Sequence, residues 1–177
     1  VEPAPAPPRP GEVQIAVSYT GLCGTDLHIF HGHMDARVSM PAIIGHEMSG
    51  VIAVLGEGVT GWTVGQPVTV MLTLSCGSCE ACTRGHGHIC HKLDFIGIDS
   101  DGSMQSSWNV PADVVVALPE DLALDEAALI EPTAVAVHDV RRARLVAGEF
   151  VVVIGGGPVG QLIASVALKR GARVVLV

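Results

Sequence analysis

Residues 150–160 read FVVVIGGGPVG, and this stretch decides the fold class of the region around it. Its first half is a continuous apolar run, which is typical of a strand buried on both faces of a parallel sheet. The glycines that follow indicate a tight turn, and residues 161–169 have the pattern of a helix stopped by a glycine. A second apolar strand is predicted over residues 173–177. The region therefore predicts the opening βαβ unit of an α/β domain.

The glycines of this turn have the spacing G-x-G-x-x-G of dinucleotide-binding turns. Gly155 would permit the tight turn, Gly157 would let the backbone approach a pyrophosphate, and Gly160 would let helix and strand pack closely. Pro158 and Val159 complete the turn at the helix N-terminus, where free N–H groups and the helix dipole favour an anion. We expect a nicotinamide dinucleotide here. The prediction includes both NAD and NADP, because the acidic residue that distinguishes them would lie beyond residue 177. The alternative is a glycine-rich turn without a ligand.

The preceding part of the chain is rich in short predicted strands. They are expected over residues 13–17, 51–55, 68–71 and 114–116, separated by glycine-rich turns. Many short strands at such intervals predict a partly open antiparallel barrel. From residue 122 the composition becomes helical, with a predicted break at Pro132. We therefore expect a β-rich domain over residues 1–137 and an incomplete α/β domain over residues 138–177.

Composition argues against two classes of partner. The 177 residues carry a formal net charge of −8, whereas nucleic-acid binding relies on clustered Lys and Arg. No apolar run approaches the roughly 18–20 residues of a membrane-spanning helix. Clustered thiols without an export signal favour a metal site in a reducing compartment over disulfides. We expect a cytoplasmic globular protein that binds neither nucleic acid nor membranes.

Four of the five cysteines lie in one short segment with the spacing C-x2-C-x2-C-x7-C: Cys76, Cys79, Cys82 and Cys90. Four thiolates at such spacing can complete a tetrahedral shell around one zinc ion, which leaves no position open for chemistry. An iron–sulfur cluster is the main alternative, but the ferredoxin motif continues with x3-C-P, whereas the gap here is seven residues. His86, His88 and His91 are competing ligands that a complete thiolate set does not need. The segment predicts a structural zinc.

The fifth cysteine, Cys23, requires a separate explanation, since a lone cysteine is often a small buried hydrophobe. One thiolate, one imidazole and a carboxylate form the ligand set of a catalytic zinc, which keeps a position open for substrate. His46 is the candidate imidazole, and Glu47 and Glu131 are the candidate carboxylates. The alternative for His46 and Glu47 is an ordinary surface pair.

Three further residues near Cys23 have candidate catalytic roles. Asp26 is placed to accept the second N–H of His46, as carboxylates commonly do for metal-bound imidazoles. Thr25 carries a hydroxyl, and His28 carries an imidazole. Together these two residues could pass a proton from a zinc-bound alcohol to solvent.

Taken together, the motifs resemble those of zinc-dependent medium-chain alcohol dehydrogenases, and the resemblance covers essentially the whole chain. The matching segments, in the family's order, are GLCGTDLH (21–28), GHEMSGVIAVLGEGV (45–59), the four-cysteine segment and VVVIGGGPVG (151–160). The second segment matches the family's zinc pattern GHE-x2-G-x5-G-x2-V. Glu131-Pro132 resembles the branch that acts on polyols and secondary alcohols, such as sorbitol, butanediol and threonine dehydrogenases. In that branch a glutamate replaces a third zinc-proximal cysteine.

This resemblance implies a mixed β and α/β fold, in which a GroES-like β-barrel catalytic domain is followed by the start of a truncated Rossmann domain. It implies two zinc ions per chain, one catalytic and one structural. It also implies hydride transfer between a small-molecule polyol or secondary alcohol and NAD or NADP, in a homo-oligomer that is usually a dimer or tetramer. Because most of the Rossmann domain is absent, we expect the chain to be part of a longer protein. The alternative is a non-catalytic binding module stapled by zinc.

Overall fold

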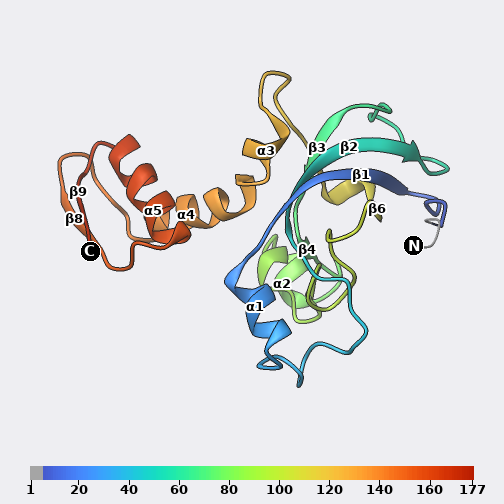
Figure 1. The fold of residues 1–177 in the computed structure, drawn as a ribbon, viewed down its shortest axis with the longest axis horizontal. Helices are drawn as coiled ribbons and strands as arrows, with labels where there is room; N and C mark the ends of the chain where they lie inside the picture. Colours follow the sequence, from blue (N-terminus) through green and yellow to red (C-terminus); the bar gives the residue numbers. More distant parts are fainter. Residues whose placement is uncertain (1–5) are drawn as a thin grey trace. The chain divides into compact units, whose positions relative to one another are not determined.

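The structure, a computed structural model, describes residues 6–177 and divides into two compact units, Val1–Ala128 and Leu129–Val177 (Figure 1). The boundary expected after residue 137 falls inside helix α4 (Ile130–Arg142). The division lies just before that helix because α4 packs along α5 (Pro158–Lys169) and so belongs as a whole to the second unit.

The first unit is built on a five-stranded antiparallel sheet with the strand order β6-β1-β2-β3-β7 (Figure 1). Its strands are β1 (Glu12–Gly21), β2 (Glu47–Leu55), β3 (Pro67–Val70), β6 (Ser107–Pro111) and β7 (Val115–Ala117). The edge strands β6 and β7 do not pair with each other, so the sheet remains open. The shorter elements are β4 (Thr73–Leu74), β5 (Asp94–Phe95), α1 (Gly24–Phe30), α2 (Glu80–Thr83), α3 (Leu124–Ala127) and the 3-10 turns Gly87–Ile89 and Ala112–Val114.

The core of this unit lies on one face of the sheet, because apolar side chains alternate along its strands. Val13 and Ile15 of β1 are fully buried, as are Ile52 of β2 and Val68 of β3. The four strands predicted from the sequence lie in or overlap β1, β2, β3 and β7. Strand β6 was not predicted, although its buried residues also alternate with polar ones.

The second unit contains the parallel pair β8 (Phe150–Val153) and β9 (Arg173–Leu176) with helices α4 and α5. The predicted strand, turn, helix and second strand are present in this order. Two details of the prediction were wrong. Pro132 does not break a helix, because it is the third residue of α4, where the missing N–H would have no partner in any case. Strand β8 is covered on one face only, and Phe150 and Val152 are exposed.

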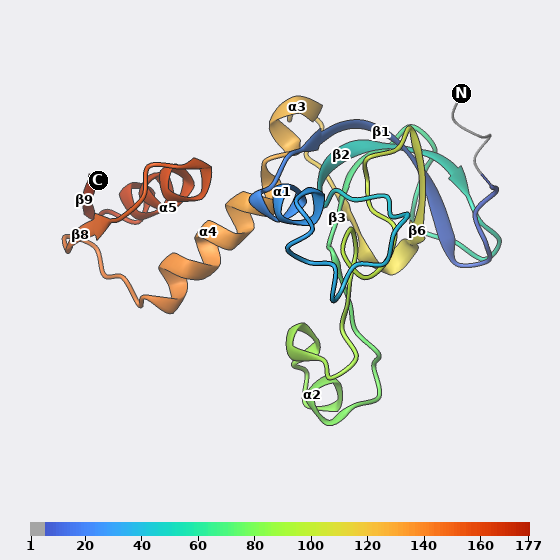
Figure 2. The same ribbon diagram turned by 60° about the horizontal axis from the view of Figure 1, so that its bottom comes forward.

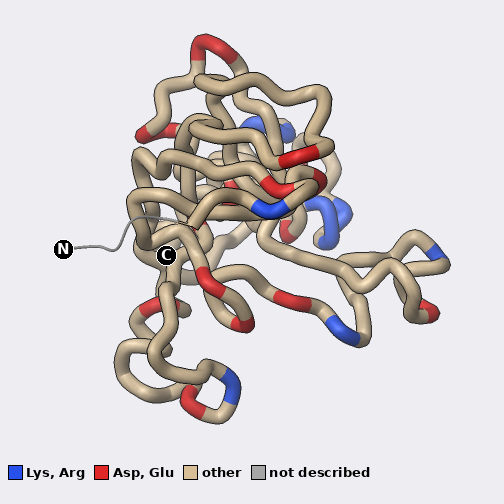
Figure 3. Tube along the Cα trace, turned by 90° about the vertical axis from the view of Figure 1, so that its right-hand side faces the viewer, with Lys and Arg blue, Asp and Glu red and all other residues tan. Residues whose placement is uncertain are grey.

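Charge and helix length complete the description. Lys and Arg are scattered along the trace between acidic residues (Figure 3). Within residues 6–177, no helix combines the length and apolarity needed to cross a bilayer.

Candidate active site and cysteine lobe

Cys23, His46 and Glu47 form one group, in which their donor atoms all lie within 4.8 Å of one another. Cys23 is the N-cap of α1, two residues after the end of β1, while Glu47 is the first residue of β2 and His46 precedes it. Strands β1 and β2 are antiparallel neighbours, with Gly21 opposite Glu47. The end of β1 therefore lies beside the start of β2, and this pairing brings the three donors together.

Gly21 is a site residue that the sequence analysis did not identify. A Cβ atom at this position would lie 2.3 Å from Oε2 of Glu47. Two atoms cannot approach this closely without a van der Waals clash, so the absence of a side chain leaves room for the carboxylate. The sequence signal for this role is the glycine two residues before Cys23, at the start of the segment GLCGTDLH (21–28).

Asp26 connects Cys23 with His46 beneath the donor group. Its Oδ2 accepts the backbone N–H of Cys23 at 2.9 Å, and its Oδ1 lies 3.8 Å from Nδ1 of His46. Both side chains are almost completely buried, and among the described residues neither this Oδ1 nor this Nδ1 has a hydrogen-bond partner. A buried imidazole with Nδ1 turned toward a carboxylate can offer Nε2 to a cation. One sulfur, one nitrogen and one carboxylate donor, with this support, fit a zinc ion.

The remaining residues predicted for this site lie on helices α1 and α4. Thr25 and His28 are three positions apart on α1 and so lie on the same side of the helix, whereas Asp26 and Ile29 form its buried side. His28 is exposed. Glu131 is the second residue of α4, in the other compact unit.

The four remaining cysteines lie in a lobe that extends away from the sheet around α2 (Figure 2). Sγ of Cys79 is 3.4 Å from Sγ of Cys82 and 3.8 Å from Sγ of Cys90, while Sγ of Cys76 is 4.0 Å from that of Cys82. Four sulfurs about 2.3 Å from a tetrahedral zinc would be about 3.8 Å apart. A disulfide would need about 2.05 Å, so these thiols are free and their geometry fits zinc.

Backbone N–H groups in this lobe donate hydrogen bonds to cysteine sulfurs. Sγ of Cys90 accepts the N–H of Cys76 at 3.3 Å and that of Lys92 at 3.2 Å. The pKa of Cys76 is lowered to about 5, mainly by the N–H of Ser78, whereas burial raises the pKa of Cys82 to about 11. N–H groups that favour thiolate over thiol also favour the ligand form that zinc requires.

The glycine turn of the second unit lies between β8 and α5. Gly155 has a φ of +105°, and Gly157 is the N-cap of α5, with Pro158 and Val159 opening the helix. A Cβ atom on Gly160 would lie 1.8 Å from the carbonyl oxygen of Gly155, so only glycine allows this approach. A Cβ atom on Gly157 would meet nothing within 4 Å. A turn open on one side, with the free N–H groups of a helix behind it, fits a pyrophosphate.

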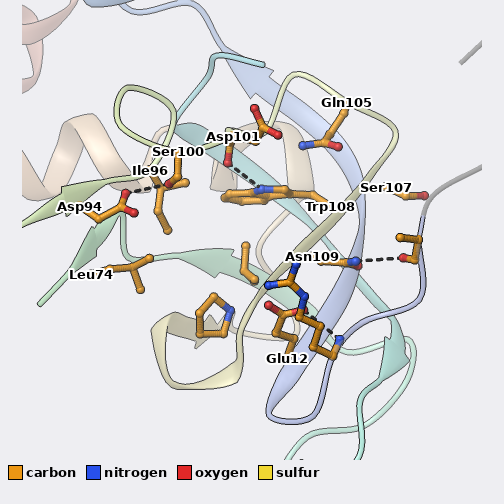
Figure 4. A pocket seen from close by; sticks show the side chains of 14 residues that line it. Glu12, Leu74, Asp94, Ile96, Ser100, Asp101, Gln105, Ser107, Trp108 and Asn109 are labelled. Atoms are coloured by element: carbon orange, nitrogen blue, oxygen red, sulfur yellow. Dashed lines mark hydrogen bonds between the residues drawn. The ribbon is translucent and has the colours of Figure 1, made fainter. Parts of the chain in front are cut away.

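A separate cavity of about 520 Å³ opens beside β6 (Figure 4). Its polar lining is largely paired within the protein: Nε1 of Trp108 donates to the carbonyl of Asp101, and the hydroxyl of Ser100 donates to Asp94. None of the predicted site residues lines this cavity. It therefore contributes nothing to the donor group.

Comparison with known proteins agrees with this geometry. Residues 9–120 match the alcohol dehydrogenase GroES-like domain. The chain belongs to this family. This GroES-like chain matches zinc-dependent medium-chain dehydrogenases in both sequence and structure, and so confirms the resemblance of its motifs.

Two curated relatives illustrate the sequence similarity of the GroES-like chain. The 2-dehydro-3-deoxy-L-galactonate 5-dehydrogenase of Pseudoalteromonas atlantica is 54% identical over 169 residues, which cover 96% of this chain and 50% of the relative. The sorbitol dehydrogenase of Halalkalibacterium halodurans is 40% identical over 172 residues, again 96% and 50% of the two chains. The chain thus spans about half the length of the curated relatives it matches.

Solved structures show the same relationship. Galactitol-1-phosphate dehydrogenase from Escherichia coli superposes with a TM-score of 0.92 at 32% identity, over 99% of this chain and 51% of that one. The cobalt- and zinc-bound thermostable alcohol dehydrogenase from Pyrobaculum aerophilum gives 0.88 at 35% identity, over 99% and 53%. A Sinorhizobium meliloti protein classed as a zinc-binding dehydrogenase, solved with NADP bound, gives 0.90 at 33% identity, over 96% and 49%.

Proposed function

We propose that this chain provides the catalytic zinc domain of an NAD(P)-linked dehydrogenase that oxidises a polyol or a secondary alcohol. The observation that carries the proposal is the group of donor atoms from Cys23, His46 and Glu47, supported beneath by Asp26. The names of the relatives support the substrate class, since they specify dehydrogenases of a sugar alcohol and a sugar acid.

Two zinc ions per chain follow from this proposal. Cys23, His46 and Glu47 would hold the catalytic ion, and the four lobe cysteines would hold the structural one. Glu131, which lies in the second compact unit, stays a prediction of the family resemblance. When bound, zinc supplies Lewis-acid polarisation of the alcohol oxygen, and the nicotinamide accepts the hydride.

The protein's own residues position the groups and move a proton. Asp26 orients His46 through Nδ1, because a buried carboxylate beside an imidazole fixes its ring. Thr25 and His28, on one side of α1, carry the alcohol proton from the hydroxyl to the imidazole and then to water. The turn from Gly155 to Gly160, with the first N–H groups of α5, would hold the pyrophosphate of a dinucleotide.

The proposal extends to the fold of the second unit, the cofactor and the cellular context of the protein. The parallel β8–β9 pair with α5 supports an incomplete Rossmann domain, because βαβ units of this kind carry the dinucleotide turn. Similarity to a protein solved with NADP supports a nicotinamide cofactor without choosing between NAD and NADP. A cytoplasmic homo-oligomer that binds neither nucleic acid nor membranes remains a prediction from the family resemblance and the composition.

Metal content and activity test the assignment together. In the complete protein, Cys23→Ser is expected to abolish alcohol oxidation and to reduce zinc from two ions per chain to one. Zinc can be measured by plasma mass spectrometry, and activity by nicotinamide absorbance across sugars, diols and threonine. Ser75→Ala, which changes a residue beside the lobe and removes no thiol, serves as a control and should keep both ions.

Three outcomes would contradict the proposal. Full activity in Cys23→Ser would show that Cys23 is not part of the catalytic site. Loss of both zinc ions in this variant would show that Cys23 supports the fold as a whole. A wild-type protein with one zinc ion and no dehydrogenase activity would favour the non-catalytic zinc-stapled module.

A further inference from the structure

The turn that follows α1 places two histidines side by side. Gly32 has a φ of +76°, its N–H donates to the carbonyl of Ile29 at 3.0 Å, and the N–H of His33 donates to the carbonyl of His28 at 2.9 Å. These two bonds, with a left-handed glycine after the C-cap residue His31, define a Schellman motif. The backbone alone therefore fixes His33 against the last turn of the helix.

A Schellman motif brings the side chain two residues after the C-cap into contact with the one three residues before it, and both are usually apolar. In this chain both are imidazoles, His28 and His33. Their Nδ1 atoms are 3.1 Å apart, and their ring centroids are 5.4 Å apart with a tilt of 41°. At this distance one Nδ1 donates a hydrogen and the other accepts it. The contact thus couples the two tautomers, so that one ring is Nδ1–H and the other is Nε2–H.

We propose that His33 is a positioning residue for His28, and this inference rests on the proposed function. Nδ1 of His33 accepts the hydrogen of Nδ1 of His28, so that Nε2 of His28 carries the free electron pair. Nε2 is then the atom that takes up the substrate proton. On uptake an N–H bond forms at Nε2, the ring becomes an imidazolium, and its hydrogen bond to His33 becomes charge-assisted and therefore stronger. Water removes the same proton afterwards, and the starting tautomer returns.

His31 provides the matched comparison within the same turn. It is exposed like His28 and His33, and its ring centroid lies 5.9 Å from that of His33 and 5.5 Å from that of Phe30. Both of its contacts are ring contacts, in contrast to the nitrogen–nitrogen contact of His28 with His33. Loss of His31 should therefore leave the tautomer of His28 unchanged.

The tautomer is measured directly on protein labelled with ¹⁵N-histidine, because two-bond N–H correlations distinguish Nδ1–H from Nε2–H rings. We expect His28 to be an Nδ1–H tautomer in the wild type and in His31→Ala. His33→Ala should shift His28 toward Nε2–H. His33→Asn should restore the wild-type pattern, because its carbonyl oxygen can accept the same hydrogen.

Activity gives the second readout in the complete protein. His33→Ala should lower kcat about tenfold with little change in KM, a part of the 10²–10⁴-fold effect of general acid–base groups, and His33→Asn should recover most of it. An Nε2–H tautomer of His28 in the wild type overturns the proposal, as does an unchanged kcat in His33→Ala. A wild type without alcohol oxidation would instead contradict the proposed function, and the tautomer measurement does not depend on activity.

Discussion

Gly21 stands opposite Glu47 in the β1–β2 ladder, and no side chain fits between them. Asp26 accepts the N–H of Cys23 and faces His46. Neither residue supplies a metal donor in the proposed site. Both nevertheless decide where the donors lie, because a shift of about 1 Å is enough to disturb a metal centre.

Gly21→Ala tests whether the residue at position 21 decides where the donor atoms lie. The new Cβ atom would lie 2.3 Å from Oε2 of Glu47, so the carboxylate must shift from its position in the donor group. We expect the zinc content of the complete protein to fall from two ions per chain to one, with circular dichroism unchanged. Gly24→Ala is the control, because a Cβ atom there meets nothing within 4 Å. Two retained zinc ions in Gly21→Ala would contradict the prediction.

A second residue-scale prediction concerns the ion pair of Arg37 and Asp99. Asp99 accepts hydrogen bonds at 2.8 and 2.7 Å from the Arg37 guanidinium, which is the main reason that the pKa of this carboxyl is lowered. A group with a lowered folded-state pKa stabilises the fold above its unfolded pKa of about 3.9, and this contribution is lost as the pH falls through the folded value. Because the pair is partly exposed, we expect about 0.5–1 kcal/mol at neutral pH.

The measurement compares wild type and Asp99→Asn by urea unfolding at several pH values. The variant should be less stable at pH 7, and the difference should shrink as the pH approaches 3. A difference that does not change with pH would show that the ion pair contributes nothing through its charge.

At the scale of elements, the cysteine lobe and the sheet obtain their order from different sources. The sheet has an apolar core in which β1, β2 and β3 contribute fully buried side chains. In the lobe, the residues between Cys76 and Cys90 are mostly exposed, and Ala81 is buried. A segment with so few buried apolar groups needs another source of stability, which a bound zinc can supply.

Cys90→Ser should therefore disorder the lobe and leave the sheet folded. Cys90 is buried and accepts two backbone N–H groups, so its loss removes one of the four zinc ligands and the centre of this network. The lobe would lose a metal contribution of ~10–16 kcal/mol. We expect rapid amide hydrogen exchange over residues 76–90, with β1 and β2 still protected.

His88→Ala is the matched variant for this experiment. His88 is exposed and lies within the same segment. If the four thiolates complete the shell, this variant keeps the structural zinc and the slow exchange of the wild type. Loss of zinc in His88→Ala would assign the imidazole to the metal and contradict the four-thiolate site.

At the scale of the whole molecule, the proposed metal and dinucleotide functions lie in different compact units. Each unit has its own buried cluster, with Val140, Ala167 and Ala172 in the second. This separation predicts that one function can be removed while the other remains.

Gly160→Ala is the variant that makes this separation measurable. Its Cβ atom would lie 1.8 Å from the carbonyl oxygen of Gly155, so α5 must move away from the turn. In the complete protein we expect loss of nicotinamide-dinucleotide binding by calorimetry, with two zinc ions per chain retained. Gly156→Ala adds a Cβ atom that meets nothing within 4 Å and should bind as the wild type does. Loss of zinc in Gly160→Ala would contradict the separation.

Much of this fold was predictable from local patterns. Alternating apolar residues predicted β1, and the apolar run before the glycine turn predicted β8, because side-chain period reports local geometry. Helix α1 was not predicted, since seven residues contain too little periodic signal. The break at Pro132 was wrong because the sequence does not show where a helix begins, and proline is tolerated in the first turn.

The family, the order of the main strands and the residues capable of metal chemistry could be predicted from the sequence, because spacing and residue type are local properties of a chain. Which of these residues meet follows from the tertiary fold. The β1–β2 ladder sets Glu47 and His46 beside Cys23, the same ladder places Gly21 opposite Glu47, and the turn after α1 places His33 beside His28. Such contacts depend on strand register and backbone turns, which position atoms to within an ångström and leave little trace in the sequence.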